Sequence, residues 1–183
     1  LKAHVPIFIA ALRSQMLRVG GAVADGILMN LVTPQYIKHA IELVKEGAQS
    51  TGRDPSQVTI GTIVMAGVSK NQEAAANAIR LRIARYVARM PFYYKLLQES
   101  GYAREMEAIA QEVARQDPDA AAKKIPDSMV STMGLVGTPQ EWRQRLKVYE
   151  DAGVQLVVLM PSLPDNGDRG TAQGISDMLQ ALS

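Results

Sequence analysis

The sequence contains no cysteine, which excludes disulfides and thiolate ligands for a metal. It also has no apolar run near the roughly 18 residues that a helix needs to span a bilayer. The charges nearly cancel, with 20 Lys and Arg against 18 Asp and Glu and a net charge of +2. Proteins that bind nucleic acid usually carry a clustered basic face instead. We therefore expect neither a membrane nor a nucleic acid as a partner.

What is present is typical of one globular domain. The 183 residues are 47% hydrophobic and 21% charged, enough to bury a sizeable core. No signal-peptide pattern opens the chain, so we expect a cytoplasmic protein. The first residue is Leu1 rather than methionine, from which we expect that the sequence begins inside a longer natural chain.

Apolar runs along the chain predict parallel strands. They are nearly continuous rather than alternating, as in strands that are covered on both faces. The runs are residues 5–12, 26–31, 58–67 and 155–160.

The segments between these runs carry helix signals. Residues 14–24 form an amphipathic pattern that Gly20 and Gly21 weaken. Thr33-Pro34 is a typical N-cap followed by proline at the first helical position. Residues 69–72 and 138–141 resemble capping boxes, which predict one helix from Ser69 to about residue 90 and another that ends before Gly153.

The order of these elements predicts an α/β fold of repeated βα units with right-handed crossovers. The exception is a helical insertion before the last strand, at about residues 91–133, with breaks at Gly101, Asp117-Pro118 and Ile125-Pro126. Four βα units are half of a (β/α)8 barrel, which needs about 250 residues. We therefore predict a single half-barrel domain over residues 1–183.

The first strand, residues 5–12, is too apolar to be the protected edge of an open sheet. Either an N-terminal half-barrel supplies its neighbour, or two copies of the chain pair. We expect a homo-oligomer or pairing with such an N-terminal half.

Three stretches carry a resemblance to a known family. They read VPIFIAALRSQMLRVGGAVADGILMNLVTPQYI, MPFYYKLLQESGY and IPDSMVSTMGLVGTPQEWRQRLKVYEDAGVQLVVLMP. In this order they resemble the C-terminal half of the bacterial-luciferase-like monooxygenase family. Within it they are most similar to the coenzyme F420-dependent oxidoreductases, the branch that includes methylenetetrahydromethanopterin reductase.

This resemblance implies a TIM barrel that holds a flavin or deazaflavin at the C-terminal ends of its strands. The strands of this chain would be the fifth to the eighth. The implied function is an oxidoreductase that transfers hydride between reduced F420 and a small organic substrate. One alternative is an FMN-dependent monooxygenase, and another is a non-catalytic half-barrel fragment or self-pairing module. Catalytic residues would lie on the N-terminal half, so none is assigned.

The end of the first strand is the main candidate for cofactor binding, at Ala10, Ala11, Leu12, Arg13 and Ser14. Two small alanines let a flat ring or its tail lie close to the backbone. Ser14 can cap the next helix, and the N–H groups of residues 15–17 favour a phosphate. Arg13 adds a bidentate donor. The alternative is a plain βα turn.

The family has Gly-Pro where this chain has Arg13-Ser14. If that glycine has a positive φ, an arginine in its place costs about 1 kcal/mol or more. The departure therefore bears on how tightly this turn can hold a cofactor.

Three further residues are candidates at the barrel mouth. Asn30 ends the second strand and could bind cofactor or substrate, or it could be a capping or turn residue before Thr33-Pro34. Met65 could line the substrate pocket and Tyr93 could close over a substrate, although packing explains either residue as well. No histidine pair with metal-ligand spacing is present, so we predict no metal site.

Overall fold

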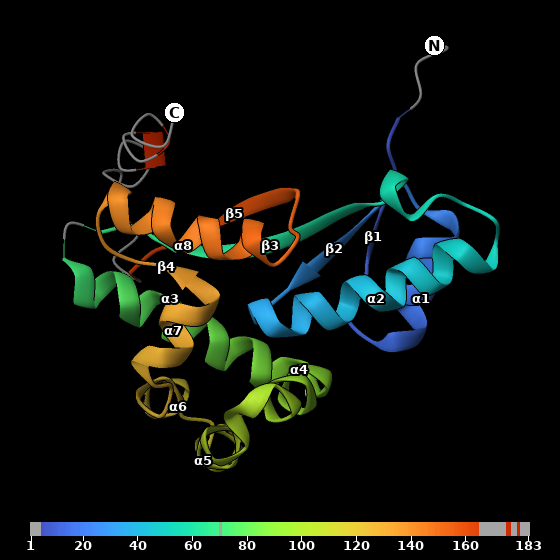
Figure 1. Cartoon of the computed structure of the whole chain (residues 1–183). Coiled ribbons are helices and arrows are strands. Elements are labelled where there is room, and N and C mark those ends of the chain that lie inside the picture. Colours follow the sequence, from blue (N-terminus) through green and yellow to red (C-terminus); the bar gives the residue numbers. More distant parts are fainter. Residues whose placement is uncertain (1–4, 70, 165–174, 177–178, 180–183) are drawn as a thin grey trace. The chain divides into compact units, whose positions relative to one another are not determined.

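The computed structural model describes residues 5–69, 71–164, 175–176 and 179 (Figure 1). The chain divides into two compact units. Unit 1 consists of Leu1–Ile63 and Val148–Val158, and unit 2 consists of Val64–Lys147 and Leu159–Ser183. We describe each unit by itself.

Unit 1 is built on parallel strands, as the apolar runs predict. Strand β1 (Phe8–Ala10) pairs in parallel with β2 (Gly26–Asn30), which pairs in parallel with β3 (Thr59–Gly67). Strand β5 (Leu156–Ser162) pairs with the other side of β3. The order β1-β2-β3-β5 therefore follows the predicted βα repeat. The first strand is shorter than residues 5–12, because the residues on either side of β1 lie outside its ladder.

Helices α1 (Ser14–Val23) and α2 (Pro34–Ser50) belong to unit 1 and touch through their backbones. A Cβ built on Gly21 would lie 2.0 Å from the carbonyl oxygen of Val44, and one on Gly47 would lie 2.0 Å from that of Arg18. Gly21, one of the two glycines that weaken the sequence pattern of α1, is thus needed for this close contact. The cost of glycine in a helix is offset by packing.

Asp25 and Gly26 fix how β1 joins the sheet. The Asp25 carboxylate accepts the backbone N–H of Ile7 at 2.8 Å, and the Asp25 N–H donates to the Ile7 carbonyl at 3.0 Å. A Cβ on Gly26 would lie 2.3 Å from the ring of Phe8. Both residues therefore help to fix the position of β1 beside β2.

Unit 2 contains the helical insertion. Its helices begin after β3 and are α3 (Gln72–Arg89), α4 (Pro91–Leu97), the π-helical turn η2 (Gln98–Tyr102), α5 (Ala103–Ala114), α6 (Pro118–Lys123) and α7 (Asp127–Met133). The predicted breaks are confirmed: Gly101 has φ 97°, Asp117 caps α6, and Pro126 precedes α7. Arg80 of α3 is nearly buried and joins Glu73 at 2.8 Å and Asp127 of α7.

A short strand that the sequence did not predict follows α7. Strand β4 (Gly134–Leu135) pairs in parallel with β3 at Met65 and Ala66. Two residues are too few for an apolar pattern to reveal them. Helix α8 (Pro139–Asp151) follows, and its last residues belong to unit 1.

The capping predictions are correct in one case and wrong in part in the other. At α8, Thr138 Oγ1 accepts the N–H of Glu141 at 3.3 Å, and Glu141 accepts the N–H of Thr138 at 2.6 Å. At α3 the cap is Asn71 and not Ser69, because Asn71 Oδ1 accepts from Ala74 while Ser69 Oγ accepts the N–H of Asn71.

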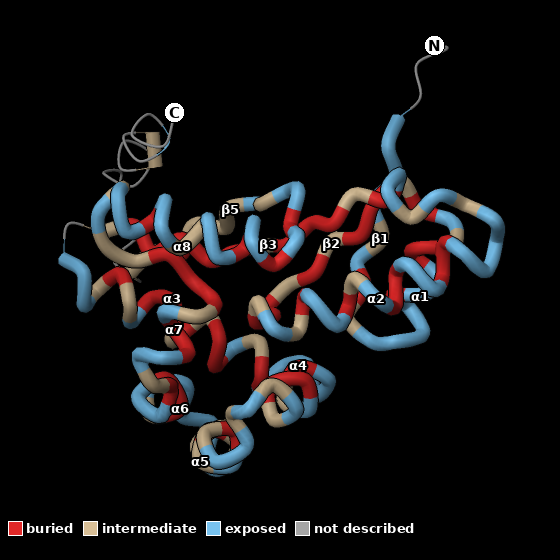
Figure 2. Tube along the Cα trace, in the orientation of Figure 1, coloured by how far each residue is buried: buried red, intermediate tan, exposed pale blue. Residues whose placement is uncertain are grey.

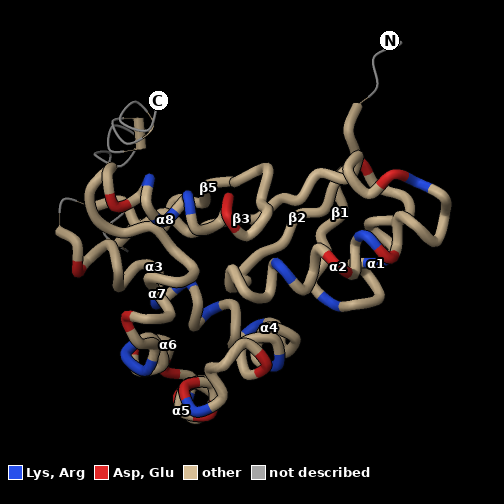
Figure 3. The backbone as a smooth tube through the Cα atoms, in the orientation of Figure 1, with Lys and Arg blue, Asp and Glu red and all other residues tan. Residues whose placement is uncertain are grey.

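Burial follows the strands of the middle of the sheet (Figure 2). Ile27 and Met29 of β2 and Val64 of β3 are fully buried. Charged residues of both signs occur along the helices (Figure 3). Arg18 of α1 and Glu46 of α2 form an ion pair at 2.8 Å. Within the described residues, no helix is long and apolar enough to cross a bilayer.

Candidate functional site

The site predicted at the end of β1 lies beside the end of β2. Ala10 pairs with Leu28, and the N–H of Ala11 donates to the Leu28 carbonyl at 3.3 Å. Ala10 is exposed, Ala11 is buried and Leu12 is half-buried. Asn30 is the last residue of β2, two residues beyond Leu28, and it is half-buried. The structure therefore brings Ala10, Ala11, Leu12 and Asn30 to one edge of unit 1.

Helix α1 begins differently from the prediction. Arg13 is the N-cap and Ser14 is the first helical residue, so the expected capping by Ser14 is wrong. In the described part of the chain, no side-chain hydrogen bond caps α1. The N–H of Leu17 donates to the Arg13 carbonyl at 2.9 Å. The first-turn amides that precede this bond are those of residues 14–16 and not 15–17.

Arg13 carries no backbone strain. Its φ of −107° and ψ of 153° are in the extended region, which every residue adopts readily. The cost expected for an arginine at a positive φ does not arise. The exposed Arg13 side chain stands directly before the open helix start, where its positive charge and the helix dipole both attract an anion.

The turn after β2 is more constrained than its sequence indicates. Leu31 has φ 56° and is 2% exposed. The buried Thr33 caps α2 by accepting the N–H of Tyr36 at 3.1 Å, and Pro34 follows as the first helical residue. Because Thr33 does the capping, the helix-cap interpretation of Asn30 is wrong.

Tyr36 is a residue that the sequence analysis missed. Its hydroxyl donates a hydrogen bond to the carbonyl oxygen of Leu12, which joins the first turn of α2 to the turn between β1 and α1. A tyrosine on a helix gives no local signal of such a contact, since the partners are 24 residues apart. Only the pairing of β1 with β2 brings the two turns together.

Met65 and Tyr93 lie in unit 2. Met65 is 1% exposed on β3. Tyr93 of α4 is 4% exposed, and its ring packs edge-on against Tyr86 at 5.2 Å and tilted against Phe92 at 4.5 Å. Phe92 itself is 44% exposed. Both predicted residues are therefore core residues by burial, with an exposed aromatic ring beside Tyr93.

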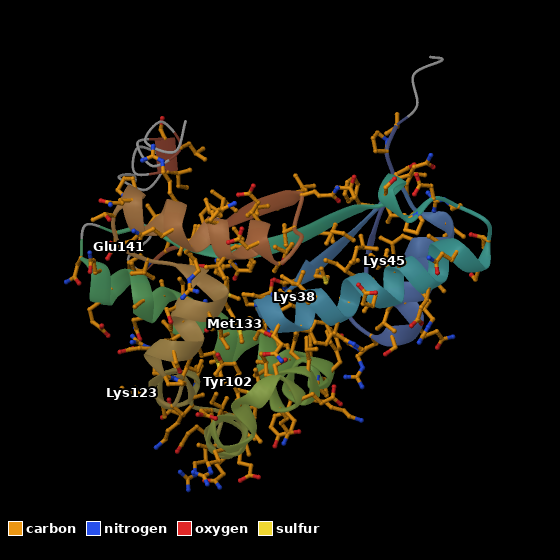
Figure 4. All side chains as sticks on the ribbon, viewed as in Figure 1. Lys38, Lys45, Tyr102, Lys123, Met133 and Glu141 are labelled. Carbon is orange, nitrogen blue, oxygen red and sulfur yellow. The ribbon has the colours of Figure 1, made fainter. Side chains whose placement is uncertain are left out.

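The start of α8, near which Figure 4 labels Glu141, differs in its capping from the start of α1. Glu141 accepts from the N–H and hydroxyl of Thr138, at 2.6 and 2.8 Å, and these bonds lower the pKa of its carboxyl. A carboxylate thus already occupies the positive end of α8. At Gly137, which has φ 105°, a Cβ would lie 2.2 Å from Glu141 Oε2. Of these two helix starts, α8 is therefore capped by a carboxylate, and α1 has no side-chain cap within the described residues.

No group of three or more histidine, aspartate or glutamate side chains that could hold a metal occurs in the part of the chain that the structure describes. The candidate site is thus a turn of small residues, backbone amides and one arginine. Such a site can bind an anionic, flat ligand, and it offers no acid or base of its own.

Comparison with known proteins assigns the family. Residues 2–156 match the luciferase-like monooxygenase family. The chain belongs to this family. Over 167 residues it is 28% identical to 5,10-methylenetetrahydromethanopterin reductase of Methanolobus tindarius, which is 90% of this chain and 51% of that protein. The enzyme of the same name from Methanopyrus kandleri is 26% identical over 165 residues, 89% of this chain and 47% of that protein.

Solved structures show the same fold. The coenzyme F420-dependent tetrahydromethanopterin reductase of Methanopyrus kandleri matches with a TM-score of 0.73 at 23% identity, over 86% of this chain and 45% of that one. An F420-dependent secondary alcohol dehydrogenase, solved with an F420-acetone adduct, matches with a TM-score of 0.67 over 100% of this chain and 50% of that one. The expected α/β fold with a parallel sheet is confirmed, and the chain spans about half the length of these relatives.

Proposed function

We propose that this chain is the C-terminal half of a TIM barrel in an F420-dependent oxidoreductase. The observation that carries the proposal is the β1–α1 turn, where Ala10 and Ala11 precede a helix start that lacks a side-chain cap within the described residues. Open amides at a helix N-terminus bind phosphate. The likeness to F420-dependent enzymes over most of the chain favours F420 as the cofactor.

The residues fit such a cofactor in kind. Ala10, Ala11 and Leu12 would lie along it, and Arg13, Ser14 and the first-turn amides would hold its phosphate. When bound, F420 supplies or accepts a hydride. The part of the protein is to bind and orient cofactor and substrate and to exclude water.

For contact with the substrate we propose Asn30 in unit 1 and, independently, Met65 and Tyr93 in unit 2. Asn30 can donate and accept hydrogen bonds at the end of β2. Met65 and Tyr93 are buried and would shape an apolar wall.

The exposed apolar residues at β1 and β5, the flanks of the sheet, support the proposal that a partner chain covers them. Ile7 and Phe8, at β1, are 65% and 37% exposed, and Leu156 and Val158 of β5 are each 38% exposed. Apolar strands at an open edge favour pairing with another chain. We propose that an N-terminal half-barrel covers these flanks, or that a second copy of the chain does so.

Two alternatives share the fold. An FMN-dependent monooxygenase fits the family name, because FMN also carries a phosphate for the α1 start. A non-catalytic half-barrel, self-paired and without cofactor, fits the open flanks alone.

The test is a titration of the full chain with F420 and, separately, with FMN, followed by absorbance and fluorescence. We expect F420 to bind, and Arg13→Ala to weaken binding about tenfold, which is about 1.4 kcal/mol. Lys45→Ala is the matched control. Lys45 is an exposed cation on α2 that pairs with Glu42 at 2.9 Å, and its loss should leave affinity unchanged. Tight binding of FMN but not F420 supports the monooxygenase, and a homodimer that binds neither supports the self-pairing module.

A further inference from the structure

The turn after β2 contains a strained residue. Leu31 has φ 56°, in the left-handed region that side chains other than glycine and asparagine rarely adopt. This conformation turns the chain from the end of β2 at Asn30 to the α2 cap at Thr33. The Leu31 side chain is 2% exposed, so its burial offsets the strain. The position at which α2 begins is therefore well determined.

Tyr36 is held firmly on this helix start. Its N–H donates to Thr33 Oγ1 at 3.1 Å, and Thr33 is 7% exposed. Its ring lies edge-on to His39, with centroids 6.2 Å apart. The neighbouring Ile37 is fully buried and anchors the same turn in the core. The hydroxyl of Tyr36 is thus presented from a rigid element.

That hydroxyl reaches the part of the β1–α1 turn that lies between the hydrogen bonds of the sheet and those of α1. Ala11 makes a bond to β2, through its N–H to the Leu28 carbonyl at 3.3 Å. The Arg13 carbonyl accepts a bond of α1, from Leu17 at 2.9 Å. The carbonyl of Leu12, between them, accepts the hydroxyl of Tyr36. This bond therefore holds Leu12, the residue between the last hydrogen bond to β2 and the first hydrogen bond of α1.

We propose that Tyr36 is a positioning residue for anion binding at the start of α1. By holding the Leu12 carbonyl, it orients the amides of residues 14–16 before any ligand arrives. A preset turn binds its ligand without the entropy loss of ordering a loop. The inference rests on the proposed function, since that function supplies the anionic ligand.

The test uses Tyr36→Phe in the full chain, which keeps the ring and removes the hydroxyl. Amide hydrogen exchange of the free protein should become faster at Ala11 and Leu17, whose N–H groups are hydrogen-bonded on the two sides of this turn, and stay unchanged along α2. The affinity for F420 should fall about 3- to 10-fold, the effect of one lost hydrogen bond. Tyr94→Phe is the matched control, because it removes the bond from Gln98 Nε2 at 3.2 Å in unit 2. It should change neither readout.

A second variant, Thr33→Ala, removes the partner of the Tyr36 N–H and should speed exchange at the same amides. Unchanged exchange at Ala11 and Leu17 in Tyr36→Phe would overturn the proposal. So would faster exchange along the whole of α2, which indicates a merely structural role, or normal affinity in a chain that binds F420. If the unaltered chain binds neither F420 nor FMN, the proposed function fails, while the exchange experiment still decides whether Tyr36 holds the turn.

Discussion

Strands β1 and β2 are neighbours in one sheet and both are apolar, yet their burial is opposite. Ile27 and Met29 of β2 are 0% exposed, whereas Ile7 and Phe8 at β1 are 65% and 37% exposed. In the described chain β2 pairs with strands on both sides, and β1 pairs with β2 alone. Burial in this sheet is therefore set by neighbours, and residue type alone does not decide it.

Helix α1 shows the same contrast between its two sides. Leu17 is 0% exposed, and Gly21 meets the backbone of α2. Met16, Val19 and Val23, spaced along another side of α1, are 43%, 40% and 69% exposed. An exposed apolar stripe on a helix that follows an open strand is consistent with our proposal that a partner covers this side of unit 1.

The largest effect should come from the covered strand. Ile27→Ala should lower the free energy of unfolding by about 3 kcal/mol, because it leaves a cavity in the core. Ile7→Ala should cost less than about 0.5 kcal/mol. Urea unfolding of the two variants measures the difference. Equal losses would mean that β1 is already covered in solution.

Substitutions on the two sides of α1 should differ almost as much in their effect on the free energy of unfolding. Gly21→Ala should cost about 2 kcal/mol, because its methyl group would collide with the Val44 carbonyl and force α1 and α2 apart. Val19→Ala, on the exposed stripe, should change the unfolding midpoint little. A harmless Gly21→Ala would contradict the close backbone contact.

A charged residue introduced beside β1 should affect association of the chain without affecting its folding. Ile7→Lys should leave the unfolding free energy of the chain unchanged and weaken self-association, or binding of a partner half-barrel, about tenfold. Sedimentation or light scattering measures this. Gln49→Lys, at an exposed position near the end of α2, is the charge-matched control. Equal association of both variants would show that the β1 edge is not an interface.

The smallest expected effect on stability concerns the start of α8. The hydrogen bonds from Thr138 lower the pKa of Glu141 in the folded chain. Its carboxylate therefore stabilises the fold above its unfolded pKa, and this contribution disappears as the pH falls through the lowered value. Glu141→Gln should lower the melting temperature slightly at neutral pH and not at all in strong acid. A loss that is independent of pH would show that shape, not charge, matters there.

Local patterns predicted much of this molecule. The apolar runs located β2 and β3 because buried parallel strands lack alternation, and the run at residues 155–160 also located β5, although part of β5 is exposed. Thr33-Pro34 and Thr138 marked helix starts because capping depends on a few adjacent residues. The candidate turn at Ala10 also lies beside Asn30 as expected, since the ends of parallel strands meet at one edge.

The errors come from contacts between distant segments. Strand β4 exists only because β3 offers a partner, and Tyr36 acts only because two turns 24 residues apart adjoin. The expected strain at Arg13 was wrong because an extended backbone there avoids a positive φ. The strain lies at Leu31 instead, where a leucine in the sequence gives no sign of it.

The attachment of β5 has a consequence for how such chains can evolve. Gln155 accepts the N–H of Ile60 through its side chain at 2.9 Å and donates its own N–H to the Ile60 carbonyl at 2.9 Å, 95 residues along the chain. One residue thus sets the register of the last strand, whatever the length of the intervening helices. Doubling such a connection costs only about 0.6 kcal/mol of loop entropy. Insertions between β3 and β5 can therefore diversify freely while the sheet keeps its alignment.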